Sequence, residues 1–232
     1  MKIGLFATCV ADTMFPQAAQ ATATVLERLG HEVVVPPAQS CCGQMHMNSG
    51  YRREARPLAE AFISTFAGFD AVVSPSSSCV GAIRELYPAL LEVGHPVLER
   101  TMELAEFLVH RLGVEDLGAS FPHRVTYHPT CHSLRVTQTG DAPLRLLRKV
   151  RGLELIELPG ASECCGFGGT FALKNSATSS AILADKCGAI ETTGAEYCAA
   201  VDSSCLLQIG GGLTRRGDRA KVIHLAEILA SR

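Results

Sequence analysis

The sequence lacks the features of several large protein classes. It contains no tryptophan, its aromatic residues make up only 6% and its formal net charge is −2. A chain without a basic field or a platform of aromatic rings is poorly suited to hold nucleic acid or an anionic membrane surface. No run of residues approaches the roughly 18 apolar residues that cross a bilayer. We therefore expect neither a nucleic-acid partner nor a membrane span.

The N-terminus also lacks the pattern of a secretory signal. Lys2 is followed by an apolar run that ends at Asp12 and is too short for a signal core. This predicts a cytoplasmic protein, and structural disulfides are disfavoured in that compartment. The ten cysteines among 232 residues are then expected to bind metal, to do chemistry or to pack as small apolar groups.

Cysteines recur in register in the two halves of the sequence. The matched positions are Cys9 and Cys131, Cys41-Cys42-Gly43 and Cys164-Cys165-Gly166, and Cys79 and Cys205. The ends match as well, because ELAEFL at 103–108 resembles HLAEIL at 224–229. A stretch with Gly, Pro and acidic residues at 113–123 suits a linker. We predict two copies of one unit, with a first domain over 1–117 and a second over 118–232.

Each copy alternates short strands with helices. The first copy predicts strands over 2–8, 31–36 and 70–75, and helices over 16–30, 51–69, 80–91 and 100–113, with Pro57 delaying or kinking the second helix. The second copy predicts strands over 124–128, 153–158, 196–202 and 221–224, and helices over 141–150, 172–194, 205–217 and the C-terminal residues. This alternation indicates an α/β protein of two tandem pseudo-repeated units, each with a mostly parallel sheet flanked by helices.

The repeated cysteines directly follow the predicted strands. In the first copy they come after each of the three strands in turn, and the second copy follows suit. The carboxyl ends of parallel strands lie at one edge of a sheet, so four thiols per copy should converge there. A single zinc ion is usually held by C-x₂₋₄-C pairs, whereas adjacent cysteines suit different irons of one multinuclear cluster. Gly43 and Gly166 would then allow close approach of the backbone to that cluster.

Two alternatives to a cluster stay open for the adjacent cysteines. They can be buried apolar filler, although two neighbouring residues rarely share one environment. They can also form a strained redox disulfide between neighbours, which leaves the remaining cysteines of the pattern without a role.

These motifs resemble the cysteine-rich CCG domain, which occurs in heterodisulfide reductase, in the glycolate oxidase iron–sulfur subunit and in the lactate utilisation protein A family. The segments VTYHPTCHSLR, ECCGFGGTF and DSSCL are most similar to the lactate utilisation protein A family, over nearly the whole chain. The resemblance implies an iron–sulfur oxidoreductase subunit of a multi-protein system that oxidises L-lactate to pyruvate. It implies as partners a second iron–sulfur protein and a small third subunit, with a small 2-hydroxy acid as candidate substrate.

The sequence departs from the full CCG pattern in both halves. Where the pattern has C-x-x-C, the first copy has Ser76 before Cys79 and the second has Asp202 before Cys205. The missing cysteine is the one that builds a non-cubane cluster in heterodisulfide reductase, but four thiolates suffice for a [4Fe–4S] cluster. The expected ligands of one or two such clusters are Cys9, Cys41, Cys42, Cys79, Cys131, Cys164, Cys165 and Cys205. Ser76 and Asp202 can supply an oxygen ligand or cap the next helix.

Histidines and glycines near the motifs can be interpreted in more than one way. His128 and His132 flank Cys131 and can support a cluster through a hydrogen bond or proton transfer, or can bond to the backbone of a loop. His46 has the same alternatives. GFGG at 166–169 predicts tight packing around a cluster, and GGG at 210–212 predicts a helix break or C-cap. Neither fits a nucleotide-binding fingerprint.

The remaining sulfur-containing residues are expected to pack in the interior. Cys187 and Cys198 have no counterparts in the first copy, and Met45 and Met47 belong to the same group. No catalytic residue can be assigned. Two rival functions remain: a non-catalytic metal-binding or scaffold module, for example with zinc, and a thiol–disulfide redox switch.

Overall fold

The computed structural model describes all residues, 1–232. It contains two four-stranded sheets in which every neighbouring pair of strands is parallel. The first has the order β2-β1-β3-β4 and the second the order β6-β5-β7-β8. The strands are β1 (Lys2–Leu5), β2 (Glu32–Val34), β3 (Ala71–Ser74), β4 (Thr101–Glu103), β5 (Arg124–Tyr127), β6 (Glu154–Ile156), β7 (Tyr197–Ala200) and β8 (Lys221–His224). The predicted class, two tandem α/β units, is confirmed.

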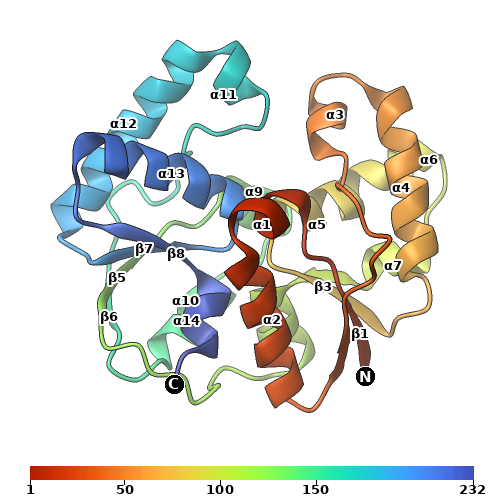
Figure 1. Ribbon diagram of the computed structural model, residues 1–232, viewed down its shortest axis with the longest axis horizontal. Helices are drawn as coiled ribbons and strands as arrows, with labels where there is room; N and C mark the ends of the chain where they lie inside the picture. The colour runs from red at the N-terminus through yellow and green to blue at the C-terminus, as the bar shows by residue number, and fades with distance from the viewer.

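Helices connect the strands and cover the sheets (Figure 1). Those of the first half are α1 (Cys9–Met14), α2 (Pro16–Arg28), α3 (Gln44–Asn48), α4 (Arg52–Phe66), α5 (Ser77–Gly81), α6 (Tyr87–Leu91), α7 (Pro96–Glu99) and α8 (Leu104–Glu106), with π-helical turns η1 (Ala82–Leu86) and η2 (Phe107–Arg111). Those of the second half are α9 (Cys131–Arg135), α10 (Ala142–Arg148), α11 (Phe171–Lys174), α12 (Ser176–Thr193), α13 (Ser203–Arg216) and α14 (Leu225–Ala230). None of them is long and apolar enough to cross a membrane.

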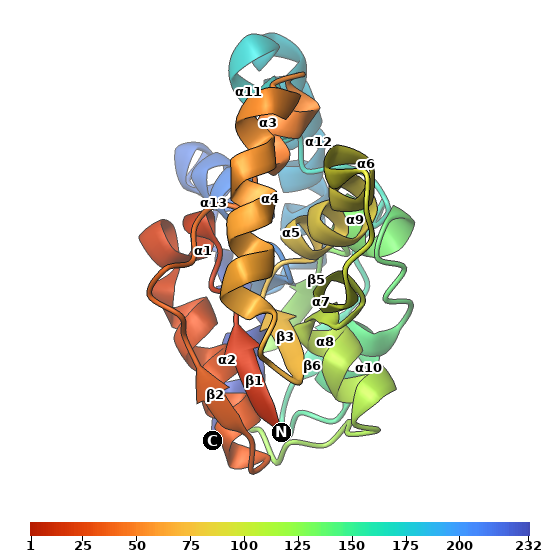
Figure 2. The ribbon, with the colours of Figure 1, turned by 90° about the vertical axis from the view of Figure 1, so that its right-hand side faces the viewer.

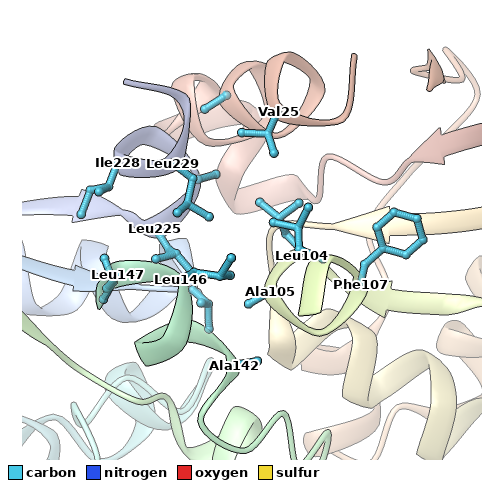
Figure 3. Packing of buried hydrophobic residues seen from close by; sticks show 14 of the residues in the cluster. Val25, Leu104, Ala105, Phe107, Ala142, Leu146, Leu147, Leu225, Ile228 and Leu229 are labelled. Carbon is cyan, nitrogen blue, oxygen red and sulfur yellow. The ribbon is translucent and has the colours of Figure 1, made fainter. Parts of the chain in front are cut away.

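The two halves share one hydrophobic core. Helix α2 packs against α14 of the other half. It does so with a buried face whose residues are spaced as an amphipathic helix requires, namely Ala18, Ala21, Thr22, Val25 and Leu26. The matching contact lies between α8 and α10. Figure 3 shows side chains from both halves meeting in this cluster of 24 buried residues. The halves therefore stabilise one another, and the boundary between 117 and 118 stays a prediction.

The prediction of one helix over 100–113 is wrong at its start. Residues Thr101–Glu103 form β4, which pairs with β3 at the edge of the first sheet. Oε2 of Glu103 then accepts hydrogen bonds from the N–H groups of Ala105 and Glu106, so the helix begins only after the strand. The sequence gives no sign of this strand, because Thr-Met-Glu is not a run of β-branched or apolar residues and no turn separates it from the helix.

Three further helix predictions need correction. Helix α4 starts at Arg52 and continues through Pro57, so proline does not delay it. The predicted helix over 172–194 is two helices, separated at Asn175, whose backbone leaves the helical region. The GGG segment neither breaks nor caps a helix, because it lies inside α13, which ends at Gly217. A Cβ on Gly212 would lie 2.7 Å from Sγ of Cys187 on α12, so this glycine lets two helices pack closely.

Candidate metal centre

All eight cysteines of the repeated pattern line one cavity of about 110 Å³ between the two halves. Helices α1, α5 and α9, which begin at the carboxyl ends of strands, meet in the middle of the molecule (Figure 1). Helices α3 and α11 lie at the same end of the molecule (Figure 2), and the hydroxyls of Ser49 and Thr170, which flank these helices, are 2.9 Å apart. The two sheet edges thus face each other across a common space.

Four thiols come together in the first half. Sγ of Cys9 lies 3.6 Å from Sγ of Cys41, and Sγ of Cys42 lies 3.3 Å from Sγ of Cys79. The thiols of the neighbours Cys41 and Cys42 also interact. Cys42 and Cys79 are buried, while the other two are partly exposed.

The second half repeats this arrangement. Sγ of Cys165 lies 3.3 Å from Sγ of Cys205, and the thiol of Cys164 interacts with those of Cys131 and Cys165. All ten cysteines of the chain are free, so no disulfide joins the neighbours. The structure therefore contains two groups of four thiols, here called quartets, that line one cavity.

The glycine of each CCG motif turns the backbone toward a cysteine sulfur. Gly43 has φ of +73° and Gly166 has φ of +87°, a region that other residues rarely adopt. The N–H of Gly43 points to Sγ of Cys41 at 3.4 Å, and the N–H of Gly166 points to Sγ of Cys164 at 3.3 Å. A Cβ on Gly166 would lie 2.6 Å from the carbonyl oxygen of Ser179. Each motif needs glycine for its turn, and the second also needs it for space.

These contacts make one thiol of each quartet unusually acidic. Hydrogen bonds from the thiols of Cys42 and Cys9, and then from the Gly43 N–H, lower the pKa of Cys41. The Cys131 and Cys165 thiols and the Gly166 N–H lower the pKa of Cys164 in the same way.

Two further thiols of each quartet have pKa values that shift in the opposite direction. Hydrogen bonds to the neighbouring thiolate and burial raise the pKa of Cys9, Cys42, Cys131 and Cys165. A bound cation would stabilise the deprotonated form of these thiols, and a thiolate-bound metal centre supplies one. The donor set accordingly fits an iron–sulfur cluster.

Comparison with known proteins agrees with this geometry. The model of the cysteine-rich domain family CCG matches residues 3–84 and 125–210. A protein named Lactate utilization protein A from Oceanobacillus iheyensis is 45% identical over 99% of this chain and 96% of its own. The chain belongs to the lactate utilisation protein A family. Proteins of that name from Geobacillus kaustophilus and Bacillus subtilis are 45% and 42% identical, with both chains fully covered.

Among solved structures the likeness is weak. A putative Asp/Glu racemase from Yersinia pestis aligns with 99% of this chain and 96% of its own, at 15% identity and a TM-score of 0.39. This likeness carries no argument about function.

Asp202 stands where the CCG pattern has a fifth cysteine, and it joins the two halves. Its Oδ1 accepts hydrogen bonds from Oγ of Ser76 at 2.6 Å, from Oγ of Ser78 at 2.8 Å and from N of Ser78 at 3.1 Å. Its Oδ2 is buried without a partner, and the side chain does not cap α13. Ser76 does cap α5, because its Oγ accepts from the N–H of Cys79 at 3.3 Å. Asp202 therefore bonds to the other half of the chain rather than to its own helix.

His128 is fully buried, and neither of its ring nitrogens has a hydrogen-bond partner. Its ring and the sulfurs of Cys165 and Cys205 place three donor atoms within 4.8 Å of one another. Burial first, and the nearby charge of Lys186 second, lower the pKa of His128 to about 4. The ring is thus neutral near pH 7. The alternative in which the ring bonds to the backbone does not apply.

His132 sits at the cavity wall. Its Nδ1 lies 3.5 Å from Sγ of Cys131, and its Nε2 lies 2.8 Å from Nε2 of Gln44 on α3 of the other half. In the tautomer in which Nε2 accepts from the amide, Nδ1–H points to the sulfur. His46 lies outside the cavity wall, with its Nδ1 buried and unpartnered.

Of the four sulfur-containing residues that were expected to pack in the interior, three do so and one does not. Cys187 and Cys198 lie in a buried apolar cluster of the second half, as predicted, and Met47 packs against the core of the first. The prediction for Met45 is wrong, because this residue is 39% exposed and lines the cavity opposite Gly169. Sequence reasoning also missed further residues of the cavity wall, namely Gln44, Asn48 and Ser78. No motif marks them, whereas Phe167, which also lines the wall, belongs to the predicted GFGG segment.

Proposed function

We propose that this chain is an iron–sulfur oxidoreductase subunit of a multi-protein system that oxidises L-lactate to pyruvate. Its eight cysteines would hold one or two [4Fe–4S] clusters. The observation that carries the proposal is the convergence of two thiol quartets on one cavity. We infer lactate as the substrate from the name of the family's members.

The residues of the site suit such a group. Iron–sulfur clusters bound by four thiolates carry single electrons at potentials set by their surroundings. The N–H groups of Gly43 and Gly166 stabilise negative charge on the sulfurs of Cys41 and Cys164. The buried thiols at the back of each quartet keep water from one side of the site.

The chain needs partners for this reaction. Oxidation of lactate to pyruvate releases two electrons and two protons, and the residues around the cavity include no hydride acceptor. We propose that the electrons leave to further proteins of the system, a second iron–sulfur protein and a small third subunit. A cytoplasmic location agrees with ten free cysteines.

Metal and sulfide analysis of anaerobically purified or reconstituted protein tests the proposal. We expect iron and acid-labile sulfide in equal amounts, four or eight of each per chain, and an EPR signal on reduction. Cys164→Ala should lose iron, while Cys187→Ala serves as the matched control because Cys187 lies outside the cavity. Zinc without sulfide would favour a scaffold module. New reactive thiols after reduction, without release of iron, would favour a redox switch.

A further inference from the structure

The second half holds an imidazole at the backbone position where the first half holds a phenyl ring. Phe6 follows β1 and its N–H donates to the carbonyl oxygen of Val73 at 2.9 Å. His128 follows β5 and its N–H donates to the carbonyl oxygen of Ala199 at 2.8 Å. Both side chains are buried, with 1% and 0% exposed. The two residues therefore occupy equivalent places beside their quartets.

The surroundings of the phenyl ring are apolar. Phe6 belongs to a buried cluster with Cys42 and Cys79. Its ring meets the edge of Phe62 with centroids 5.3 Å apart. A phenyl ring offers no donor atom, so at this place the first half has only its thiols to offer a metal.

The surroundings of the imidazole ring leave both nitrogens without a partner. The charged neighbour of His128 is Lys186, whose Nζ donates instead to the carbonyl oxygen of Gly160 at 2.7 Å. A buried polar atom without a partner destabilises the fold and calls for a specific reason. The atoms that do lie close to the ring are the sulfurs of Cys165 and Cys205, within 4.8 Å. Imidazole nitrogen and thiolate sulfur are joint ligands of zinc and of iron in proteins.

We propose that His128 forms a nitrogen–sulfur donor set with Cys165 and Cys205, so that the second half binds metal through imidazole as well as thiolate. The first half, with Phe6 in the equivalent place, binds through sulfur alone. This inference rests on the proposed function, because the metal concerned is the iron held by the cysteines. A neutral imidazole ligand makes an iron–sulfur centre easier to reduce than thiolates alone. Electrons therefore collect at the second half.

Pulsed EPR of the reduced protein, produced with ¹⁵N-labelled histidine, measures the coupling of histidine nitrogen to the metal centre. It tests the inference without any substitution. We expect a strongly coupled histidine nitrogen in protein that also contains iron and sulfide. In His128→Phe, which gives the second half the residue of the first, this coupling should vanish. A chelator should then remove iron about 10-fold faster or more.

His132→Phe is the matched control. His132 also lies beside the second quartet, with Nδ1 3.5 Å from Sγ of Cys131, but the nitrogen coupling should survive its removal. If His128→Phe does not fold, His128→Gln replaces it, and the spectrum of the parent protein needs neither variant.

The outcomes separate this inference from the proposed function. Iron and sulfide without a strongly coupled histidine nitrogen would overturn the inference and leave the proposed function in place. So would a coupling that disappears in His132→Phe and persists in His128→Phe. Absence of iron and sulfide from the parent protein would overturn both.

Discussion

Replacement of Asp202 distinguishes a residue that holds the two halves together from a residue that binds metal. Asp202→Ala removes the acceptor of three hydrogen bonds from Ser76 and Ser78. The two serine hydroxyls are 3.1 Å apart and can turn toward each other, but the N–H of Ser78 is fixed. Leaving the N–H of Ser78 without a partner lowers the free energy of unfolding by about 1–3 kcal/mol, and the weaker contacts of the two hydroxyls lower it by about 1 kcal/mol more. We expect the free energy of unfolding to fall by about 2–4 kcal/mol.

Asp202→Asn keeps an oxygen at the place of Oδ1 and removes the buried charge, so the expected loss is about 1 kcal/mol or less. Urea denaturation of the reduced, metal-free protein measures both changes. Iron content after anaerobic reconstitution should remain that of the parent in Asp202→Asn. Ser76→Ala is the control, because it removes one donor and the cap of α5, at a cost of about 1 kcal/mol. If Asp202→Asn lost iron while its metal-free stability stayed unchanged, Asp202 would be a ligand and this reasoning would be refuted.

Three other outcomes follow from the site and its surroundings. Gly43→Ala should lower the free energy of unfolding by about 1–2 kcal/mol because its φ is positive. Gly166→Ala should lower it by about 3–4 kcal/mol, because a Cβ there also meets the carbonyl oxygen of Ser179. Equal losses in thermal or urea unfolding would contradict this close contact at Gly166. Burial raises the pKa of Glu103 to about 8, so the folded protein binds a proton that the unfolded chain releases above about pH 4–5. Stability should therefore fall by up to about 1.4 kcal/mol per pH unit as the pH rises from about 5 to 8, and urea titrations of Glu103→Gln should show a flatter profile. Cys198 lies in the buried apolar cluster of the second half and not in the cavity wall, so Cys198→Ala should retain its iron while Cys205→Ala loses it, and iron analysis that found the opposite would reassign the second quartet.

Much of the fold could be predicted because the determining signals are local. Seven of the eight strands lie within predicted strand ranges, since each is a short run of β-branched or apolar residues bounded by turns. The repeat of the cysteines then placed all eight at strand ends. The rule that carboxyl ends share one edge accounts for their grouping in fours.

The rest of the site depends on contacts that no local signal reports. Asp202 and Ser78 are 124 residues apart and are joined by a hydrogen bond between the halves. Met45 and Gly169 likewise meet only because the two sheet edges face each other. The strand β4 was missed for a different reason, since Thr101–Glu103 has no run of β-branched or apolar residues and leads directly into a helix without a turn.

The packing of α2 on α14 and of α8 on α10 has a consequence for how the two sides of the cavity can differ. Each of these two contacts pairs a helix of the first half with a helix of the second, and the two contacts match each other, as they do in an isologous interface between identical subunits. Two identical subunits would have to change both sides of a shared cavity with every substitution. A single polypeptide is free of that constraint, and Phe6 and His128 show that the two sides carry different chemistry. Phe6 packs in an apolar cluster with other phenyl rings, whereas the imidazole of His128 lies beside the sulfurs of Cys165 and Cys205.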